Sequence, residues 1–327
     1  MDEVEPMPDA VYQTSRAVGD AWSWLLMREA LLHGVRRFAD FQKNLGIARS
    51  TLSARLTQLM DGGLLTRGPE GSKAAGDYLP TPAGEDFFDC LMTAMAWGDR
   101  WYAHRETRPL LVTHLACGSE ASPQLRCEAC RKVLLAQDVR PERPELRLGV
   151  SRVPGHTHRA PDYELLERFR PCSIARTQTV LGDWWSCLVV REAFFDVHRF
   201  DEFRFNLDVA TNILTSRLSR LVEHGVLRRT PYQTRPVRHE YHLTDKGLDL
   251  YPVALAIIGW GDRWKSPTGP LVPLTHLTCG QSLRAQLSCG TCGADLFRKD
   301  VDIAYPILKT VADRPTRQPR TGPQHDP

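Results

Sequence analysis

The spacing of apolar residues between positions 199 and 225 predicts two short helices joined by a tight turn. One set recurs at the spacing of a helix face: Phe200, Phe203 and Leu207. After a break at 208–209, a second set follows at the same kind of spacing: Leu214, Leu218, Leu221 and Val222. Gly225 suits the end of that second helix, because glycine tolerates a left-handed backbone. The pattern predicts a helix-turn-helix, and the basic, Thr/Pro/Tyr/Val-rich stretch at 228–242 predicts a β-hairpin wing after it.

The pattern occurs a second time, earlier in the chain. The string LGDWW at 181–185 corresponds to VGDAW at 18–22, and WGDRW occurs both at 97–101 and at 260–264. The LTSRL string of the second predicted helix corresponds in the same order to LSARL. So many anchors in one order predict an internal duplication, with units of about 130 residues each.

Each unit is expected to contain the same elements. A first helix (about 14–33 and 175–196) precedes the helix-turn-helix, and a long helix (about 82–99 and 245–262) follows the wing. A tail with cysteines closes each unit. The expected boundaries are a disordered leader at 1–12, a first unit at 13–137, a linker at 138–164, a second unit at 165–304 and a disordered tail at 305–327.

Bulk composition narrows the class of protein. The 327 residues are enough for two cores, and the formal net charge of only +3 means that a nucleic-acid site requires local clustering of basic residues. No apolar run is long enough to span a bilayer, and the acidic N-terminus does not resemble a signal peptide. We therefore expect a cytoplasmic, nucleoid-associated protein with reduced thiols. The sequence has no phosphate-binding glycine loop and no nucleophile motif, so we do not expect an enzyme.

A family resemblance is carried by the string CSIARTQTVLGDWWSCLVVREAF, which is followed by RFDEF, LTSRL, GVLRR, HEYHLTDKG and GWGDRW. These strings resemble the HxlR-type winged helix-turn-helix regulators over nearly all of 172–302 and, less faithfully, over 13–140. The resemblance implies a mostly α-helical fold with small β wings. It also implies a bacterial repressor or activator that works as a homodimer on a two-fold symmetric operator, here with two copies fused in one chain.

Polar side chains on the face opposite the buried stripe of each second helix, or on the flank of that face, are the candidate readers of DNA bases and phosphates. In the second unit they are Thr211, Asn212, Thr215, Ser216, Arg217 and Arg220. In the first unit they are Ser50, Thr51, Arg55 and Gln58. The alternative is that this face is simply solvated. The wing and the resemblance favour contact with double-stranded DNA.

The two wings differ in charge. The wing at 228–242 has four arginines against the single acid Glu240: Arg228, Arg229, Arg235 and Arg238. The stretch 66–80 balances Arg67 and Lys73 against two acids. Because phosphate contacts supply much of the affinity, we expect the second unit to bind DNA more strongly, and the first unit to be a weaker reader.

Both tails have the spacing His-x2-Cys-x9-Cys-x2-Cys. The candidate zinc ligands are His114, Cys117, Cys127 and Cys130 in the first tail, and His276, Cys279, Cys289 and Cys292 in the second. Thiolates and imidazoles form structural zinc sites, so each tail is expected to close its own zinc knuckle, with up to two zinc ions per chain. A reversible disulfide in each Cys-x2-Cys and plain burial are the alternatives.

Other residues raise further hypotheses. Cys172 occupies a place where some members of the resembled family have a cysteine that senses oxidants, which requires a low pKa and exposure. Three tryptophan pairs match between the units, and they either anchor the interface between units or form the walls of a pocket for a small-molecule effector. We expect a sequence-specific regulator that acts as a single-chain pseudo-dimer or as a homodimer of it. A protein-interaction or thiol/metal-sensing module is the alternative.

Overall fold

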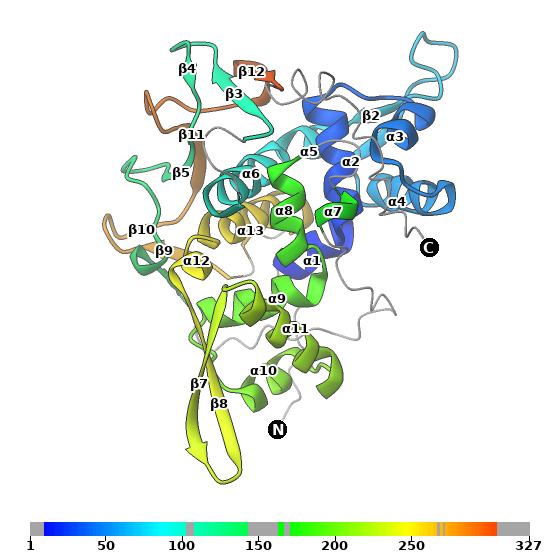
Figure 1. Cartoon of the computed structure of the whole chain (residues 1–327). Coiled ribbons are helices and arrows are strands. Elements are labelled where there is room, and N and C mark those ends of the chain that lie inside the picture. The colour runs from blue at the N-terminus through cyan, green and yellow to red at the C-terminus, as the bar shows by residue number, and fades with distance from the viewer. Residues whose placement is uncertain are drawn as a thin grey trace, which may run out of the picture.

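The computed structural model describes residues 10–102, 108–142, 163–166, 171–266, 269–270 and 272–305 (Figure 1). The first unit contains helices α1 (Ala10–Val18), α2 (Ala21–Leu32), α3 (Phe38–Leu45), α4 (Arg49–Asp61), α5 (Pro82–Asp86) and α6 (Phe88–Tyr102). Its strands are β1 (Leu65–Arg67), β2 (Tyr78–Pro80), β3 (Leu111–His114), β4 (Ser119–Glu120), β5 (Pro123–Cys127) and β6 (Val139–Pro141). β1 and β2 form a short wing, and β3 to β6 belong to the tail.

The second unit repeats this order after the short helix α7 (Tyr163–Leu166). Its helices are α8 (Ser173–Leu181), α9 (Trp184–Phe194), α10 (Phe200–Leu207), α11 (Thr211–Glu223), α12 (Asp245–Leu248) and α13 (Tyr251–Lys265). Its strands are β7 (Leu227–Thr234), β8 (Val237–Leu243), β9 (Leu274–His276), β10 (Gln281–Ser282), β11 (Ala285–Cys289) and β12 (Val301–Ala304). The mostly helical fold with two helix-turn-helix units and small β wings is confirmed.

The first helix of each unit is broken where one continuous helix was expected. Asp20 has an extended backbone and accepts a hydrogen bond from the backbone N–H of Ser23 at 3.0 Å, so α2 starts anew there. Asp183 caps α9 in the same way through Ser186 at 3.1 Å. A side chain that satisfies one of the orphan N–H groups at a helix start fixes the break between the two helices.

The expected outer boundaries also differ from the observed ones. Helix α1 begins at Ala10, inside the segment assigned to the leader. Strand β6 lies inside the segment assigned to the linker, and helix α7 begins inside it. Residues 1–9, 143–162 and 306–327 lie outside the described part of the chain, so the rest of the leader, linker and tail stays a prediction.

The two units exchange their first helices. Helix α1 packs on α13 of the second unit, and α8 packs on α6 of the first. The Thr14 hydroxyl donates to the carbonyl of Ile257 at 3.1 Å, and its counterpart Thr177 donates to Ala94 at 2.6 Å. These pairs are equivalent under the repeat, so an approximate two-fold axis relates the units.

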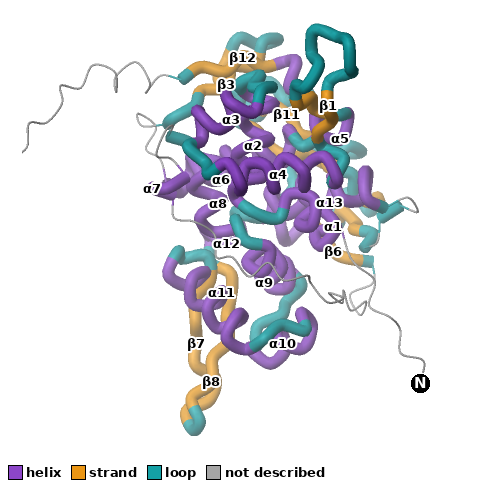
Figure 2. The backbone as a smooth tube through the Cα atoms, turned by 90° about the vertical axis from the view of Figure 1, so that its right-hand side faces the viewer, coloured by secondary structure: helices purple, strands orange, loops and turns teal. Residues whose placement is uncertain are grey.

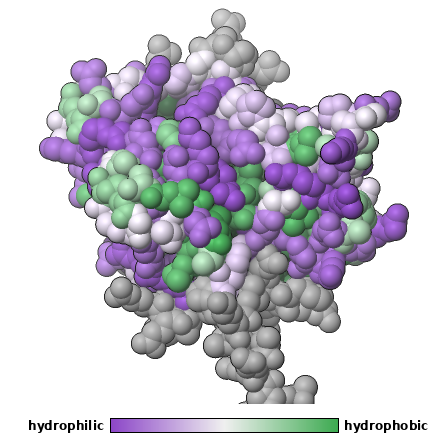
Figure 3. All heavy atoms as spheres, turned by 90° about the horizontal axis from the view of Figure 1, so that it is seen from above, coloured by the Kyte–Doolittle hydropathy of each residue, from purple (hydrophilic) through white to green (hydrophobic). Residues whose placement is uncertain are grey.

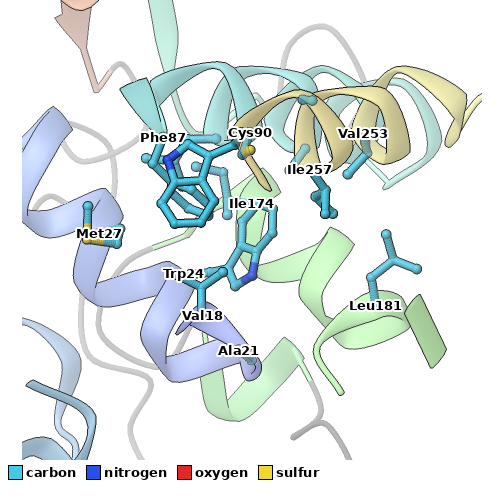
Figure 4. Packing of buried hydrophobic residues seen from close by; sticks show 14 of the residues in the cluster. Val18, Ala21, Trp24, Met27, Phe87, Cys90, Ile174, Leu181, Val253 and Ile257 are labelled. Atoms are coloured by element: carbon cyan, nitrogen blue, oxygen red, sulfur yellow. The ribbon is translucent and has the colours of Figure 1, made fainter. Parts of the chain in front are cut away.

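A single hydrophobic core runs through both units (Figure 4). In the close view the Trp24 ring of the first unit lies beside Ile174 of the second. The Phe87 ring lies edge-on to Trp260 with centroids 5.9 Å apart. The Trp260 indole N–H donates to the carbonyl of Ala83 at 2.7 Å, while Trp97 donates to Lys246 at 3.0 Å. These matched tryptophans anchor the interface between units, as one of the two hypotheses proposed.

The tails of the two units pair with each other instead of forming separate sheets. Strand β5 is antiparallel to β11, and Leu125 lies opposite its own repeat counterpart Leu287. Strand β12 pairs with β3, and β6 pairs with β9, so each tail ends on the opposite unit. Figure 1 shows these strands together on one side of the helical core, away from α3 and α4. The two-fold axis therefore continues from the helices into the tails.

The surface is largely polar. The face in Figure 3 carries hydrophilic side chains over most of its area, with apolar ones gathered in a band near its middle. Among the described helices, none combines the length and apolarity required to cross a membrane.

Candidate nucleic-acid interface and metal clusters

The second helix-turn-helix has the geometry predicted for it. Helix α10 ends at Leu207, and the capping residue Asp208 adopts a left-handed backbone with φ of 45° that turns the chain toward α11. Within α11, Leu214, Leu218 and Leu221 are buried against the rest of the unit. The apolar stripe thus fixes which face of α11 points outward.

The outward face of α11 is polar. It exposes Thr211, Asn212, Thr215, Ser216 and Ser219. Figure 2 looks onto the side of the molecule that carries both α4 and α11, with β1 toward one end and the β7–β8 hairpin at the other. A helix of this kind next to a hairpin presents hydroxyl and amide groups that can bond base edges or phosphates.

Two predicted DNA contacts, Arg217 and Arg220, point inward. Arg217 is 5% exposed, and its Nε donates to Oδ1 of Asp183 at 2.7 Å. Arg220 is 3% exposed, and its Nε and Nη2 donate to the carbonyl of Thr179 at 3.1 and 2.7 Å. Both residues therefore tie α11 to the helices behind it and are not available to DNA in this arrangement.

The first unit uses the counterparts of these residues in the same way. Arg55 of α4 forms an ion pair with Asp20, the counterpart of Asp183. Gln58 donates to the carbonyl of Arg16, the counterpart of Thr179, at 3.1 Å. Sequence position alone placed Arg220 and Gln58 on the polar face opposite the apolar stripe, and Arg217 and Arg55 on its flank. The partners that sequence position did not indicate are the helix-cap aspartates for Arg217 and Arg55, and the backbone carbonyls of Thr179 and Arg16 for Arg220 and Gln58.

The outward face of α4 keeps Ser50 exposed and Thr51 partly exposed. A residue that the sequence analysis missed, Arg49, is exposed at the first position of α4, where it corresponds to Thr211. Its guanidinium lies 5.5 Å from the ring centroid of Phe38. A cation at a helix N-terminus opposes the helix dipole, so the location favours a role toward an external anion over a structural one.

The second wing is a long basic hairpin. Strands β7 and β8 pair from Leu227 and Leu243 outward to a tip at 234–237, and Figure 1 shows the hairpin projecting from the body. The four arginines predicted there, Arg228, Arg229, Arg235 and Arg238, are all exposed. Arg238 lies 3.6 Å from Asp201, whereas no ion pair within the described residues engages the other three.

The first wing is short and its arginine is engaged. Arg67 donates to the carbonyl of Gly76 and to the hydroxyl of Tyr78, both at 2.6 Å. Its guanidinium carbon also lies 3.8 Å from the centroid of the Tyr78 ring. Arg67 and Lys73 are both exposed, but these contacts hold the Arg67 guanidinium against its own wing. The first wing therefore presents two exposed basic residues where the second wing presents four.

The eight Cys/His candidates form two clusters, with a pairing that differs from the expected one. The first cluster contains His114, Cys117, Cys289 and Cys292. The second contains Cys127, Cys130, His276 and Cys279. In each cluster the ligand atoms lie within 4.8 Å of one another, and all nine cysteines of the chain are free. The expectation that each tail closes its own site is wrong, because the His-x2-Cys pair of one tail faces the Cys-x2-Cys pair of the other.

The cluster distances suit a tetrahedral metal site. Nδ1 of His114 lies 3.4 Å from the sulfur of Cys117 and 3.3 Å from that of Cys292. In the other cluster, Cys127 and Cys279 have their sulfurs 3.9 Å apart. Zinc bond lengths imply tetrahedron edges of about 3.6 Å between nitrogen and sulfur and about 3.8 Å between sulfurs. The side chains are therefore already spaced as ligands around one ion.

Backbone N–H groups face the Cys-x2-Cys sulfurs. Burial raises the pKa of Cys289, but hydrogen bonds from the backbone N–H groups of Cys292 and Thr291 outweigh it and lower that pKa to about 7. Hydrogen bonds from the N–H groups of Cys130 and Ala129 act on Cys127 in the same sense, although burial there leaves the pKa raised. Such turns stabilise the thiolate form, which is the form that binds a metal.

The candidate sensor Cys172 is buried and 6% exposed. Its thiol lies beside Arg28 of the other unit, whose pKa is lowered by burial but raised overall by Cys172 and Glu29. Arg170, the basic residue near Cys172 in sequence, lies outside the described residues. The burial opposes access by an oxidant, so sensing stays a prediction.

A cavity of about 540 Å³ lies between the long helix α6 and the first tail. It is lined by Trp97, Asp99, Arg100, Leu110, Glu120 and, from the second unit, Asp249. Burial raises the pKa of Asp99 to about 6, despite a hydrogen bond from Ser173. The volume of the cavity, about 540 Å³, falls in the range of small-molecule sites.

The sequence is similar to those of known helix-turn-helix transcriptional regulators. Residues 17–106 and 180–268, together more than half of the chain, match the family model described as HxlR-like helix-turn-helix. An uncharacterised HTH-type transcriptional regulator of Mycobacterium tuberculosis is 40% identical over 139 residues, which are 42% of this chain and 88% of that protein. The HTH-type regulator YdeP of Bacillus subtilis, also uncharacterised, is 32% identical over 98 residues, or 30% and 77% of the two chains. The solved structure of PA1607, a candidate transcription factor, is 39% identical and covers 42% of this chain and 97% of its own, with a TM-score of 0.38.

Proposed function

The chain belongs to the HxlR-like helix-turn-helix family, with two copies in tandem, and its broad role is that of a DNA-binding transcriptional regulator. We propose that it acts in the cytoplasm and binds double-stranded operator DNA sequence-specifically. We propose further that one chain binds as a pseudo-dimer. The observation that carries the proposal is the exposed polar face of α11 beside a hairpin with four exposed arginines. The helix supplies groups for base edges, and the hairpin supplies cations for phosphates.

The approximate two-fold axis supports the pseudo-dimer. Helix exchange between the units and the symmetric β5–β11 pairing reproduce within one chain the relation that a homodimer has between two. The two reading surfaces differ in sequence, since Arg49 starts α4 where Thr211 starts α11. We therefore propose an operator with two unequal half-sites about one helical turn apart.

The proposed contacts are those that face outward. In the second unit they are Thr211, Asn212, Thr215, Ser216, Arg228, Arg229, Arg235 and Arg238. In the first unit they are Arg49, Ser50 and Thr51. We also propose that two chains pair. A small-molecule effector is a further part of the proposal, and the 540 Å³ cavity supports it.

Structural zinc belongs to the same proposal. Three thiolates and one imidazole per cluster are a donor set typical of zinc, and with four protein ligands no position is open for a catalytic water. Up to two ions per chain would be bound. The expected role is structural: zinc would hold the tails in place behind the reading helices.

Binding to duplex DNA with two matched double variants tests the DNA proposal. R228Q/R229Q removes two exposed cations of the long wing, whereas R67Q/K73Q removes the two basic residues of the short wing. We expect the first variant to lose about 60-fold in affinity at 0.1 M salt, since two phosphate contacts contribute about 0.9 each to the salt exponent. The second variant should lose less than fivefold.

Equal losses would contradict the asymmetry between the wings. Unchanged, sequence-blind binding in both variants would favour the alternative function, a protein-interaction or thiol/metal-sensing module. Analytical ultracentrifugation of the protein on a short duplex distinguishes one chain per operator from a pair of chains.

A further inference from the structure

We propose that the two metal sites are shared between the units, so that each bound ion bridges the first unit to the second. The proposal rests on the proposed zinc binding and adds to it the identity of the ligands of each ion. One ion takes His114 and Cys117 from the first tail with Cys289 and Cys292 from the second. The other takes the remaining four ligands.

The pairing of β5 with β11 places the Cys-x2-Cys ligands of each tail at the site of the other tail. Because β5 and β11 run antiparallel, Ala285 lies opposite Cys127 and Pro123 lies opposite Cys289. Each Cys-x2-Cys turn therefore reaches the end of the strand pair where the other tail begins. There the turn meets the His-x2-Cys pair, whose histidine is the last residue of β9 or β3.

The contacts across the tails are as close as those within them. Nδ1 of His276 lies 3.3 Å from the sulfur of Cys279 in its own tail and 3.4 Å from that of Cys130 in the other. Nδ1 of His114 lies 3.4 Å from Cys117 and 3.3 Å from Cys292. Both clusters have this geometry, related by the two-fold axis, so one coordination scheme accounts for both.

The bridges would complement the helix exchange. The tails pack on the long helices, β5 against α6 and β11 against α13. In addition, Arg298 of the second tail donates to the carbonyl of Leu31 in the first unit at 2.6 Å. Each ion would close a link between residues more than 140 positions apart in sequence, and so would hold the units in one relative position.

The test is the zinc content of full-length variants, measured by mass spectrometry after purification without chelator. Shared sites predict that H114A/C117S/C289S/C292S retains one zinc ion, because all four substitutions fall in one cluster. They predict that H114A/C117S/C127S/C130S, which has the same number of substitutions, retains none. Sites closed within each tail predict the reverse, none for the first variant and one for the second, which would overturn the proposal.

Milder variants keep the test valid if the quadruple variants do not fold. Competition with a colorimetric chelator counts how many ions are weakened in C117S/C292S, where both changes lie in one cluster, and in C117S/C130S, where they lie in two. Shared sites predict one weakened ion in the first variant and two in the second, and the opposite counts would overturn the proposal. A wild-type protein without zinc would instead refute the zinc binding on which the proposal rests.

Discussion

The inward orientation of Arg217 leads to a prediction opposite to the one its sequence position suggests. Arg217→Met removes the cation that faces Asp183 at 2.7 Å, where both side chains are nearly fully buried. Removing one partner of a buried pair costs about 3 to 5 kcal/mol. We expect a loss near 3 kcal/mol in the free energy of unfolding, because Asp183 still accepts hydrogen bonds from the N–H and hydroxyl of Ser186.

Arg228→Met is the matched control, with the same substitution at an exposed position of the wing. It should change the free energy of unfolding by less than about 0.5 kcal/mol. It should weaken DNA binding about eightfold at 0.1 M salt and lower the salt exponent by about 0.9, as expected for one phosphate contact.

Urea unfolding followed by tryptophan fluorescence, together with fluorescence anisotropy on an operator duplex below the unfolding transition, measures both quantities for both variants. The reasoning is refuted if R217M keeps wild-type stability and loses DNA affinity. In that case Arg217 would face the DNA as its position on α11 suggested.

Two further predictions follow from the interface between units. Gly98→Ala places a Cβ about 2.1 Å from the carbonyl oxygen of Ser173 and should cost about 1 to 3 kcal/mol. Gly259→Ala, with no described heavy atom within 4 Å of its Cβ, should instead stabilise α13 by up to about 1 kcal/mol. A higher melting temperature for Gly98→Ala than for Gly259→Ala would contradict the helix exchange. Burial, reinforced by Asp86, raises the pKa of Asp89 to about 7 despite the nearby Arg263. Ionisation of Asp89 therefore disfavours the folded state increasingly as pH rises from about 4 to 7. Asp89→Asn should be more stable than the wild type at pH 8 but not at pH 4. If the melting temperatures of the two proteins change with pH in parallel, Asp89 does not have this raised pKa.

The elements that could be predicted from the sequence are those that local periodicity determines. The stripe of Leu214, Leu218 and Leu221 gave α11 and its buried face, and the basic stretch after Gly225 gave the hairpin. The repeat gave the tandem architecture, because each anchor string recurs in order. The break at Asp20 and Asp183 was within reach, since a Gly-Asp step before an apolar run is a helix-start signal.

The remainder depends on contacts between segments far apart in sequence. Periodicity placed Arg220 on the polar face and Arg217 on its flank, but it does not show that the carbonyl of Thr179 and Asp183 lie behind them. The spacing in the tails predicted the eight Cys/His residues that the structure brings together in two clusters. That spacing is the same in both tails, however, and fits closure within a tail as well as exchange between tails. Only the pairing of β5 with β11 distinguishes the two arrangements.

The most direct test of the account is selection of bound sequences from a random duplex pool at two salt concentrations, with the full-length protein. The account predicts enrichment of one motif with two unlike halves about ten base pairs apart, and it predicts weaker binding at the higher salt. Enrichment of a single half-site would mean that only the second unit reads DNA. A pool that shows no enrichment at either salt concentration would contradict sequence-specific recognition by this chain.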